Sequence, residues 1–191
     1  MSSRSARAAG FAARARRVRA LVLDVDGVLT DRRMILSERG DELKSFDTRD
    51  GIGIGLARRA GFKTALITGE KSPIAQARGD RLGVDAVVLG ARRKADALER
   101  LLAEWGLGPE TAAYVGDDLL DIPALQRAGL AIAVADAAPE VRAVAHAVTR
   151  ARGGRGAVRE CVERILRAQG RWREVVTAFV VEHGGAPGAW R

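Results

Sequence analysis

Short apolar runs alternate with longer segments of mixed polarity along most of the chain. The runs have the length and the Val, Ile and Leu content of buried strands, and the segments between them are long enough for helices. Strands are expected at about residues 18–23, 63–67, 85–89, 111–115, 130–134 and 148–149, and helices at about 50–60, 73–82, 94–105, 119–128, 138–145 and 157–168. This alternation predicts an α/β fold with a parallel sheet and helices on both faces.

Residues 31–46 depart from the alternation. Two apolar stretches flank residues 38–41, and Gly40 in this short polar segment favours a turn, so a β-hairpin is expected. The hairpin is too small to be a separate lid domain. We therefore expect one domain over residues 18–170, interrupted by the hairpin, and a C-terminal tail over residues 171–191.

Charge is distributed unevenly along the 191 residues. The net charge is +8, but six arginines precede the first acidic residue, Asp24, and subtracting them leaves about +2 for the remainder. Residues 1–17, rich in Ser, Ala and Arg, are predicted to form a disordered basic tail, with a fraying helix as the alternative. A transit peptide has a similar composition and stays an alternative. The tail could bind a polyanion weakly, but aromatic residues are only 4% of the chain, too few for a stacking platform, so no nucleic-acid partner is expected.

The overall composition, with 47% hydrophobic and 29% charged residues, is typical of a soluble globular domain. No apolar run approaches the ~20 residues of a membrane span, so no membrane association is expected. The single cysteine, Cys161, cannot form an internal disulfide. This cysteine usage fits a reducing compartment, and we expect a cytoplasmic protein.

The segment LVLDVDGVLT, residues 21–30, carries the strongest chemical signal. Its apolar run ends in Asp24 and Asp26, which are followed at once by Gly27. Ligands of open α/β sheets bind at the carboxyl ends of the strands, where these carboxylates are expected. Burying them uncompensated would cost several kcal/mol per charge. The pattern therefore favours a hard cation with oxygen ligands, most simply Mg²⁺, over acids that only cap the next turn.

Further polar groups follow other predicted strands or begin a helix, and all can reach the same edge of the sheet. They are Thr68 and Gly69 after the strand 63–67, Lys94 at a helix start, and Asp117, Asp118 and Asp121 in the loop after the strand 111–115. Each has a structural alternative: Thr68–Gly69 as a plain turn, Lys94 as a surface charge, and the acids as helix caps.

Taken in order, these segments resemble the four motifs of the haloacid dehalogenase (HAD) superfamily, with DVDGVLT as the first. The resemblance implies a HAD-like (Rossmann-like) fold in which Asp24 is the nucleophile and a metal ligand. Asp26 would be the general acid/base, and its main-chain carbonyl would also reach the Mg²⁺ ion. Thr68 and Lys94 would hold phosphoryl oxygens. Asp117 would be the direct metal ligand, supported by Asp118 and Asp121 through water or hydrogen bonds.

Three further features resemble the 3-deoxy-D-manno-octulosonate 8-phosphate phosphatase family and its relatives, which include nonulosonate (KDN or sialate) 9-phosphate phosphatases. They are the hairpin in place of a cap domain, the segment SFDTRDGIGI at 45–54 and the segment GGRGAVRE at 153–160. The resemblance implies a sugar-acid phosphate substrate, an aspartyl-phosphate intermediate and a capless homotetramer joined through the hairpins. The residues expected to border the substrate pocket are Asp47, Arg49, Asp50, Gly51 and Arg78, with Arg155 as a contact across the subunit interface. For Arg78 and Arg155 a surface salt bridge is the alternative.

Two positions depart from the octulosonate phosphatases. Those enzymes typically have arginine where this chain has Glu70 and Gly55. Glu70 beside an anionic sugar acid is expected to change specificity, because like charges repel. TGEK at 68–71 instead resembles the nine-carbon phosphatases, so an eight- or a nine-carbon substrate stays open. A catalytically silent HAD assembly module is disfavoured, because every catalytic position is present.

Overall fold

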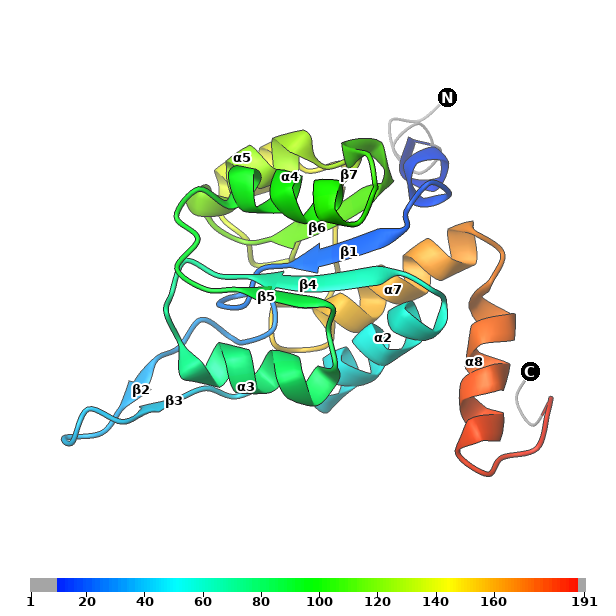
Figure 1. The fold of residues 1–191 in the computed structure, drawn as a ribbon, viewed down its shortest axis with the longest axis horizontal. Helices are drawn as coiled ribbons and strands as arrows, with labels where there is room; N and C mark the ends of the chain where they lie inside the picture. Colours follow the sequence, from blue (N-terminus) through cyan, green and yellow to red (C-terminus); the bar gives the residue numbers. More distant parts are fainter. Residues whose placement is uncertain (1–9, 189–191) are drawn as a thin grey trace.

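A six-stranded parallel sheet lies at the centre of the structure, a computed structural model that describes residues 10–188 (Figure 1). Its strands have the order β5-β4-β1-β6-β7-β8. Their bounds are β1 Ala20–Leu23, β4 Lys63–Ile67, β5 Ala86–Val88, β6 Ala112–Gly116, β7 Leu130–Ala133 and β8 Ala147–Val148. All four residues of β1 are buried, as expected for an apolar strand in the middle of a doubly covered sheet.

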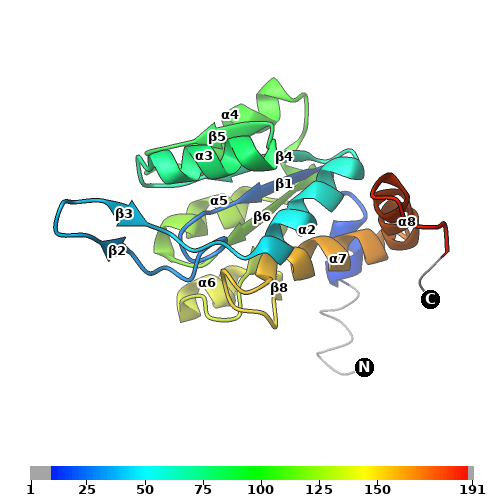
Figure 2. The same ribbon diagram turned by 90° about the horizontal axis from the view of Figure 1, so that it is seen from below.

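Helices cover both faces of the sheet, which confirms the predicted α/β class (Figures 1 and 2). One face carries α2 Thr48–Arg59, α3 Pro73–Leu82 and α7 Ala157–Ala168, with α2 packed on α7. The other carries α4 Lys94–Glu104, α5 Ile122–Arg127 and α6 Pro139–Val144, with α5 in contact with both α4 and α6. Two short 3₁₀ turns, η1 Pro109–Thr111 and η2 Leu119–Asp121, precede β6 and α5.

Local signals explain where helices begin and end. The helix α3 has the predicted bounds, with Pro73 in its first turn and Gly83 just beyond its last residue at φ 63°. Proline is preorganised for a first turn, and glycine adopts the left-handed conformation at a helix end without strain. The helix α2 begins before the expected residue 50, because the side chain of Asp47 accepts a hydrogen bond from the N–H of Arg49 and caps it.

The predicted hairpin is present, with β2 Ile35–Leu36 antiparallel to β3 Glu42–Leu43. It extends away from the body on the side of the carboxyl ends of the sheet strands (Figures 1 and 2). Four of its apolar side chains are more than half exposed: Met34, Ile35, Leu36 and Leu43. The hairpin thus presents an apolar surface that nothing within residues 10–188 covers.

Within the N-terminal segment, residues 10–17 differ from the disordered tail expected over residues 1–17 and agree better with the helical alternative. Residues 1–9 lie outside the described residues, but residues 10–15 are helical. Phe11 and Ala15, four residues apart on one helix face, are buried in the main core. Arg14 Nη1 donates to the carbonyl of Gly129 at 2.9 Å, and Gln169 Nε2 donates to the carbonyl of Ala15 at 3.0 Å. Because the segment is rich in arginine, its composition did not indicate that this short amphipathic turn packs against the core.

The C-terminal segment also differs from the expected tail over residues 171–191. Trp172 begins the helix α8, Trp172–Glu182, and is buried together with Val175. Arg171 Nη1 donates to the carbonyl of Ala60 at 2.9 Å, and Arg59 pairs with Glu182. The packed domain therefore extends from about residue 10 to residue 182. None of the helices within residues 10–188 has both the length and the apolar character needed to cross a bilayer.

Replacing Phe11 by alanine is expected to lower the free energy of unfolding by about 3 kcal/mol, because the change leaves a cavity at a buried aromatic position. Urea denaturation measures the loss, and the exposed neighbour change Arg17→Ala is the matched control. Activity of the folded protein should be unchanged, since Phe11 lies outside the candidate site. An unaltered unfolding midpoint in Phe11→Ala would show that the N-terminal turn does not contribute to the core.

Candidate active site

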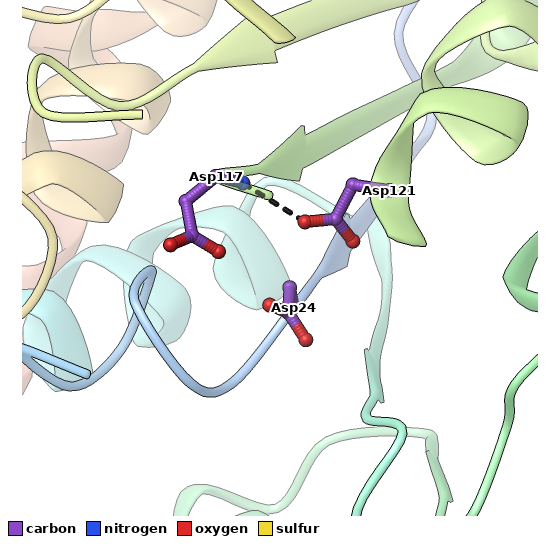
Figure 3. A group of neighbouring side chains, drawn as sticks. All are labelled: Asp24, Asp117 and Asp121. Atoms are coloured by element: carbon purple, nitrogen blue, oxygen red, sulfur yellow. Dashed lines mark hydrogen bonds between the residues drawn. The ribbon is translucent and has the colours of Figure 1, made fainter. Parts of the chain in front are cut away.

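Three carboxylates converge beyond the carboxyl ends of two neighbouring strands (Figure 3). Asp24 follows β1, Asp117 follows β6, and the two strands pair in parallel register. Each of Asp24, Asp117 and Asp121 offers an oxygen within 4.8 Å of the others. Asp24 and Asp117 are only 4% and 1% exposed, and Asp121 is fully buried. The predicted motifs one and four are thus brought together.

Asp121 has donors on both of its oxygens. Its Oδ1 accepts from Lys94 Nζ at 2.7 Å and from the hydroxyl of Tyr114 at 2.8 Å. Its Oδ2 accepts from the backbone N–H groups of Asp117 and Asp118, at 2.9 and 3.2 Å. Four donors fill the acceptor sites of one carboxylate. Asp121 therefore holds the loop and the lysine in place and has no oxygen left for a direct ligand.

Asp117 is the opposite case. Both of its carboxylate oxygens are buried, and neither accepts a hydrogen bond from any residue within 10–188. The nearest cation is Arg32, whose Nε lies 3.6 Å from Oδ2. Burial, with a further contribution from Asp121 and against the opposing charge of Arg32, raises the pKa of Asp117 to about 7. Buried polar atoms are rarely left unpaired, so this carboxylate fits a hard cation such as Mg²⁺.

Lys94 lies between the nucleophile candidate and the orienting carboxylate. Its Nζ is 2.7 Å from Asp24 Oδ1 and 2.7 Å from Asp121 Oδ1. Burial lowers the pKa of Lys94, but the charges of Asp24 and Asp121 outweigh this effect and raise it, so the lysine stays protonated. Burial and the charge of Asp121 hold the pKa of Asp24 well above its usual range, against the effect of Lys94. Three carboxylates with one ammonium leave negative charge for a divalent cation to neutralise.

Asp26 lies at the mouth of this cluster, with its side chain 29% exposed. The hydroxyl of Thr68, directly after β4, lies 3.5 Å from Asp26 Oδ2 and accepts from the N–H of Glu70 at 3.1 Å. Lys44 Nζ donates to Asp26 Oδ1. Burial lowers the pKa of Lys44, but the hydrogen bonds and charges of Asp26 and Glu42 outweigh it and raise that pKa.

Lys44 was missed by the sequence analysis. The available signal was the period of two along the hairpin strand, which places Glu42 and Lys44 on one face and Leu43 on the other. Arg32 was also missed. It adopts φ 69°, a left-handed conformation, and pairs with Asp136 as well as approaching Asp117. The sequence around Arg32 carries no signal for either contact.

Glycines allow the loops of the site to approach one another. Gly27 has φ 98°, and a Cβ there would lie 2.0 Å from Asp117 Oδ2. A Cβ on Gly153 would lie 1.7 Å from the carbonyl oxygen of Gly27. The N–H of Gly154 donates to the carbonyl of Val28 at 2.9 Å. The GGRG segment therefore packs directly against the loop that follows the nucleophile strand.

The structure corrects the expectation for Asp50. Asp50 is fully buried, and its two oxygens accept from the backbone N–H groups of Gly156 and Arg159, at 3.1 and 2.9 Å. It therefore caps the amino end of α7 and does not border an open pocket. Asp118 is a cap as well, since its side chain accepts from the N–H of Leu119.

The other expected pocket residues are accessible but do not join the carboxylate cluster. Arg49 pairs with Asp47 at 2.8 Å, and its hydrogen bonds lower the pKa of Asp47. Arg155 is exposed, with Nη2 3.9 Å from an oxygen of Asp31. Gly51 lies beside Arg78, whose guanidinium carbon is 5.1 Å from the ring centre of Phe46.

Glu70 is exposed at the rim of the site, after Thr68 and Gly69. Its carboxylate makes no hydrogen bond or ion pair within residues 10–188, and only its backbone is held, through Thr68 and Gly90. The structure therefore leaves the carboxylate of Glu70 available to a ligand.

Residues 47–129 match the family model of haloacid dehalogenase-like hydrolases. The chain is 44% identical to 3-deoxy-D-manno-octulosonate 8-phosphate phosphatase KdsC of Escherichia coli strain K12 over 162 residues. These aligned residues are 85% of this chain and 86% of that protein. A probable YrbI family phosphatase of Pseudomonas syringae pv. phaseolica is 44% identical, with a TM-score of 0.87 over 90% of this chain and 97% of that one. The 3-deoxy-D-manno-octulosonate 8-phosphate phosphatase of Moraxella catarrhalis, solved with magnesium, phosphate and KDO, is 35% identical, with a TM-score of 0.86 over 88% and 97% of the two chains.

Proposed function

Since the chain belongs to the 3-deoxy-D-manno-octulosonate 8-phosphate phosphatase family of haloacid dehalogenase-like hydrolases, we propose that it removes the terminal phosphate from a 3-deoxy-2-ulosonate sugar acid. The chain is a phosphoric monoester hydrolase that uses Mg²⁺. The observation that carries the proposal is the pairing of an unpartnered buried carboxylate, Asp117, with the Asp24–Lys94 ion pair at the strand ends. The leading substrate is 3-deoxy-D-manno-octulosonate 8-phosphate, the compound named for the E. coli and M. catarrhalis relatives.

In the proposed first step, an oxygen of Asp24 attacks phosphorus, the bond between phosphorus and the sugar oxygen breaks, and an aspartyl phosphate forms. Asp26 donates a proton to the leaving alkoxide. In the second step, Asp26 takes a proton from a water molecule, whose oxygen attacks phosphorus. The bond from phosphorus to Asp24 breaks, and inorganic phosphate leaves.

The residues around Asp24 supply the charge that this reaction needs. Lys94, the Thr68 hydroxyl and the Gly69 N–H would hold phosphoryl oxygens, because phosphoryl transfer depends mainly on positioning and charge neutralisation. Asp24, Asp117 and the main-chain carbonyl of Asp26 would hold Mg²⁺, which would supply positive charge to offset the repulsion between a carboxylate and a phosphate monoester. Asp121 keeps Lys94 and the Asp117 loop oriented through its four hydrogen bonds.

A nonulosonate 9-phosphate is the second candidate substrate, and the segment TGEK at 68–71, which resembles the nine-carbon phosphatases, favours it. Phosphate release from octulosonate 8-phosphate and nonulosonate 9-phosphate, measured side by side, tests the substrate. Release from neither sugar-acid phosphate would contradict the proposed function.

Glu70→Arg is expected to shift the ratio of kcat/KM values toward octulosonate 8-phosphate by about tenfold or more. The change replaces a carboxylate by a guanidinium that can pair with the sugar carboxylate, and such a charge-assisted hydrogen bond contributes roughly 1.5–3 kcal/mol. Glu104→Arg, an exposed acid at the end of α4, is the matched control. Equal ratios in wild type and folded Glu70→Arg would show that Glu70 has no role in specificity.

The proposal includes assembly of four copies through the hairpins. The exposed apolar side chains of Met34, Ile35, Leu36 and Leu43 support it, since a cluster of this kind on a projecting hairpin is typical of a subunit interface. Arg155, exposed near the site, would contact the neighbouring copy. Light scattering of the purified protein measures the oligomeric state.

A further inference from the structure

The side chain of Lys44 is buried, although it belongs to a hairpin whose apolar side chains are exposed. It directly follows β3, where Leu43 is more than half exposed, yet the side chain of Lys44 is only 1% exposed. Burying a lysine costs hydration and side-chain entropy, so a buried lysine needs compensating partners. Here the partners are Asp26 Oδ1, which accepts from Nζ, and Glu42 Oε1, at 3.2 Å.

The two oxygens of Asp26 therefore have different surroundings. Oδ1 is engaged by the ammonium group of Lys44. Oδ2 has only the hydroxyl of Thr68, at 3.5 Å, which is at the outer limit of a hydrogen bond. Oδ2 thus lies on the side of Thr68, which directly follows β4, the strand that pairs with β1 beside Asp24.

Resting on the phosphatase function proposed above, we propose that Lys44 is a positioning residue that keeps Oδ1 of Asp26 occupied, so that Oδ2 exchanges the proton in both steps. In the first step the proton on Oδ2 moves to the sugar oxygen as its bond to phosphorus breaks. In the second step Oδ2 takes a proton from the attacking water as the bond between phosphorus and Asp24 breaks. Lys44 keeps all of its protons throughout.

A direct role for Lys44 in binding the substrate anion is disfavoured by the charges around it. Asp26 and Glu42 together carry one more negative charge than Lys44 can neutralise, and the ammonium group is already enclosed between them. A purely structural ion pair is the remaining alternative. The two roles differ in one measurable respect, which is whether the effect of Lys44 depends on the leaving group.

The leaving group separates these roles because only an alkoxide needs a proton from Asp26. The first substrate is 3-deoxy-D-manno-octulosonate 8-phosphate, which releases an alkoxide. The second is 4-nitrophenyl phosphate, whose nitrophenolate is stable without a proton. The ratio kcat/KM is compared, since it reports the steps up to the formation of phosphorylated Asp24.

In Lys44→Met, kcat/KM is expected to fall by about 10- to 100-fold for the sugar phosphate, a part of the 10²–10⁴ that acid/base catalysis contributes. The fall for 4-nitrophenyl phosphate should be less than about threefold by the same reasoning. Lys44→Arg, which keeps a cationic donor, should recover most of the sugar-phosphate activity. Lys63→Met is the control, because Lys63 also pairs with a carboxylate, that of Asp85, at the start of β4, at the opposite end of that strand from Thr68.

A double-mutant cycle with Asp26→Asn gives a second readout. In that background Lys44→Met should leave the ratio of the two kcat/KM values unchanged, since the Asp26 carboxylate that exchanges the proton is already absent. If Lys44→Met fails to fold, as judged by circular dichroism, Lys44→Gln replaces it in the same measurements.

Equal losses on both substrates in a folded variant, or no loss on the sugar phosphate, would overturn the inference and leave the phosphatase function standing. Wild-type protein that releases phosphate from neither octulosonate 8-phosphate nor nonulosonate 9-phosphate would instead overturn the proposed function, and this inference with it. The two failures are therefore distinguishable from the wild-type activity alone.

Discussion

Asp24→Asn is expected to abolish turnover, with a loss of about 10⁵-fold or more, as for removal of a catalytic nucleophile elsewhere. An amide oxygen cannot form the acyl phosphate, and the change also removes one negative charge from the proposed metal ligands. The fold should survive, because asparagine has the shape of aspartate and Lys94 keeps Asp121 as its partner at 2.7 Å. Phosphate release measures the loss, and circular dichroism measures folding.

The matched control is Asp96→Asn, which removes an exposed carboxylate from the first turn of α4. That variant should retain wild-type activity. A folded Asp24→Asn protein with a tenth of the wild-type rate would contradict the assignment of Asp24 as the nucleophile, whatever the substrate.

Chelation of the metal with EDTA is expected to abolish turnover, and added Mg²⁺ should restore it. Without a divalent cation the buried carboxylates of Asp24 and Asp117 repel an anionic phosphate, and Lys94 alone does not balance them. Ca²⁺ should be a poor substitute, because it takes more oxygen ligands at longer distances than Mg²⁺. Full activity after exhaustive chelation would refute the role of the metal.

Metal binding should also change stability in a way that depends on pH. A ligand at 100 times its Kd stabilises the folded state by about 2.7 kcal/mol. Because the pKa of Asp117 is raised to about 7, a proton competes with Mg²⁺ more strongly at pH 6 than at pH 8. The rise in Tm on adding Mg²⁺ should therefore be larger at pH 8, and Asp117→Asn should remove most of it. An equal rise at both pH values would contradict this coupling.

In the metal-free protein, the pH dependence of the stability that Asp117 contributes has the opposite sign. A carboxyl group whose pKa is raised on folding favours the folded state when it is protonated. The contribution of Asp117 to metal-free stability should thus decline as the pH rises from about 4, its usual pKa, to about 7. The Tm in EDTA, measured in parallel with Asp117→Asn as the reference, isolates this contribution.

The sequence was informative wherever the signal was local. The apolar run before Asp24 and the run before Asp117 each predicted a buried strand with carboxylates at its end, and the structure has both. The helix α3 has the predicted bounds, which agree with Pro73 in its first turn and Gly83 beyond its end, because proline restricts and glycine widens the backbone conformations of a residue. The same reasoning failed for residues 10–17, where arginines outnumber the apolar residues that pack.

The sequence by itself determined the order of the strands along the chain and the side of the sheet on which the polar groups gather. Parallel strands present their carboxyl ends at one edge, so Asp24, Thr68 and Asp117 had to meet there. Only the tertiary structure decided which carboxylate accepts hydrogen bonds, which is left for a metal ion and which caps a helix. Asp121 accepts from four donors, Asp117 from none within residues 10–188, and Asp50 caps a helix more than 100 residues away in the sequence. It also brought Lys44 from the hairpin to Asp26, because contacts across such separations depend on packing that no local pattern encodes.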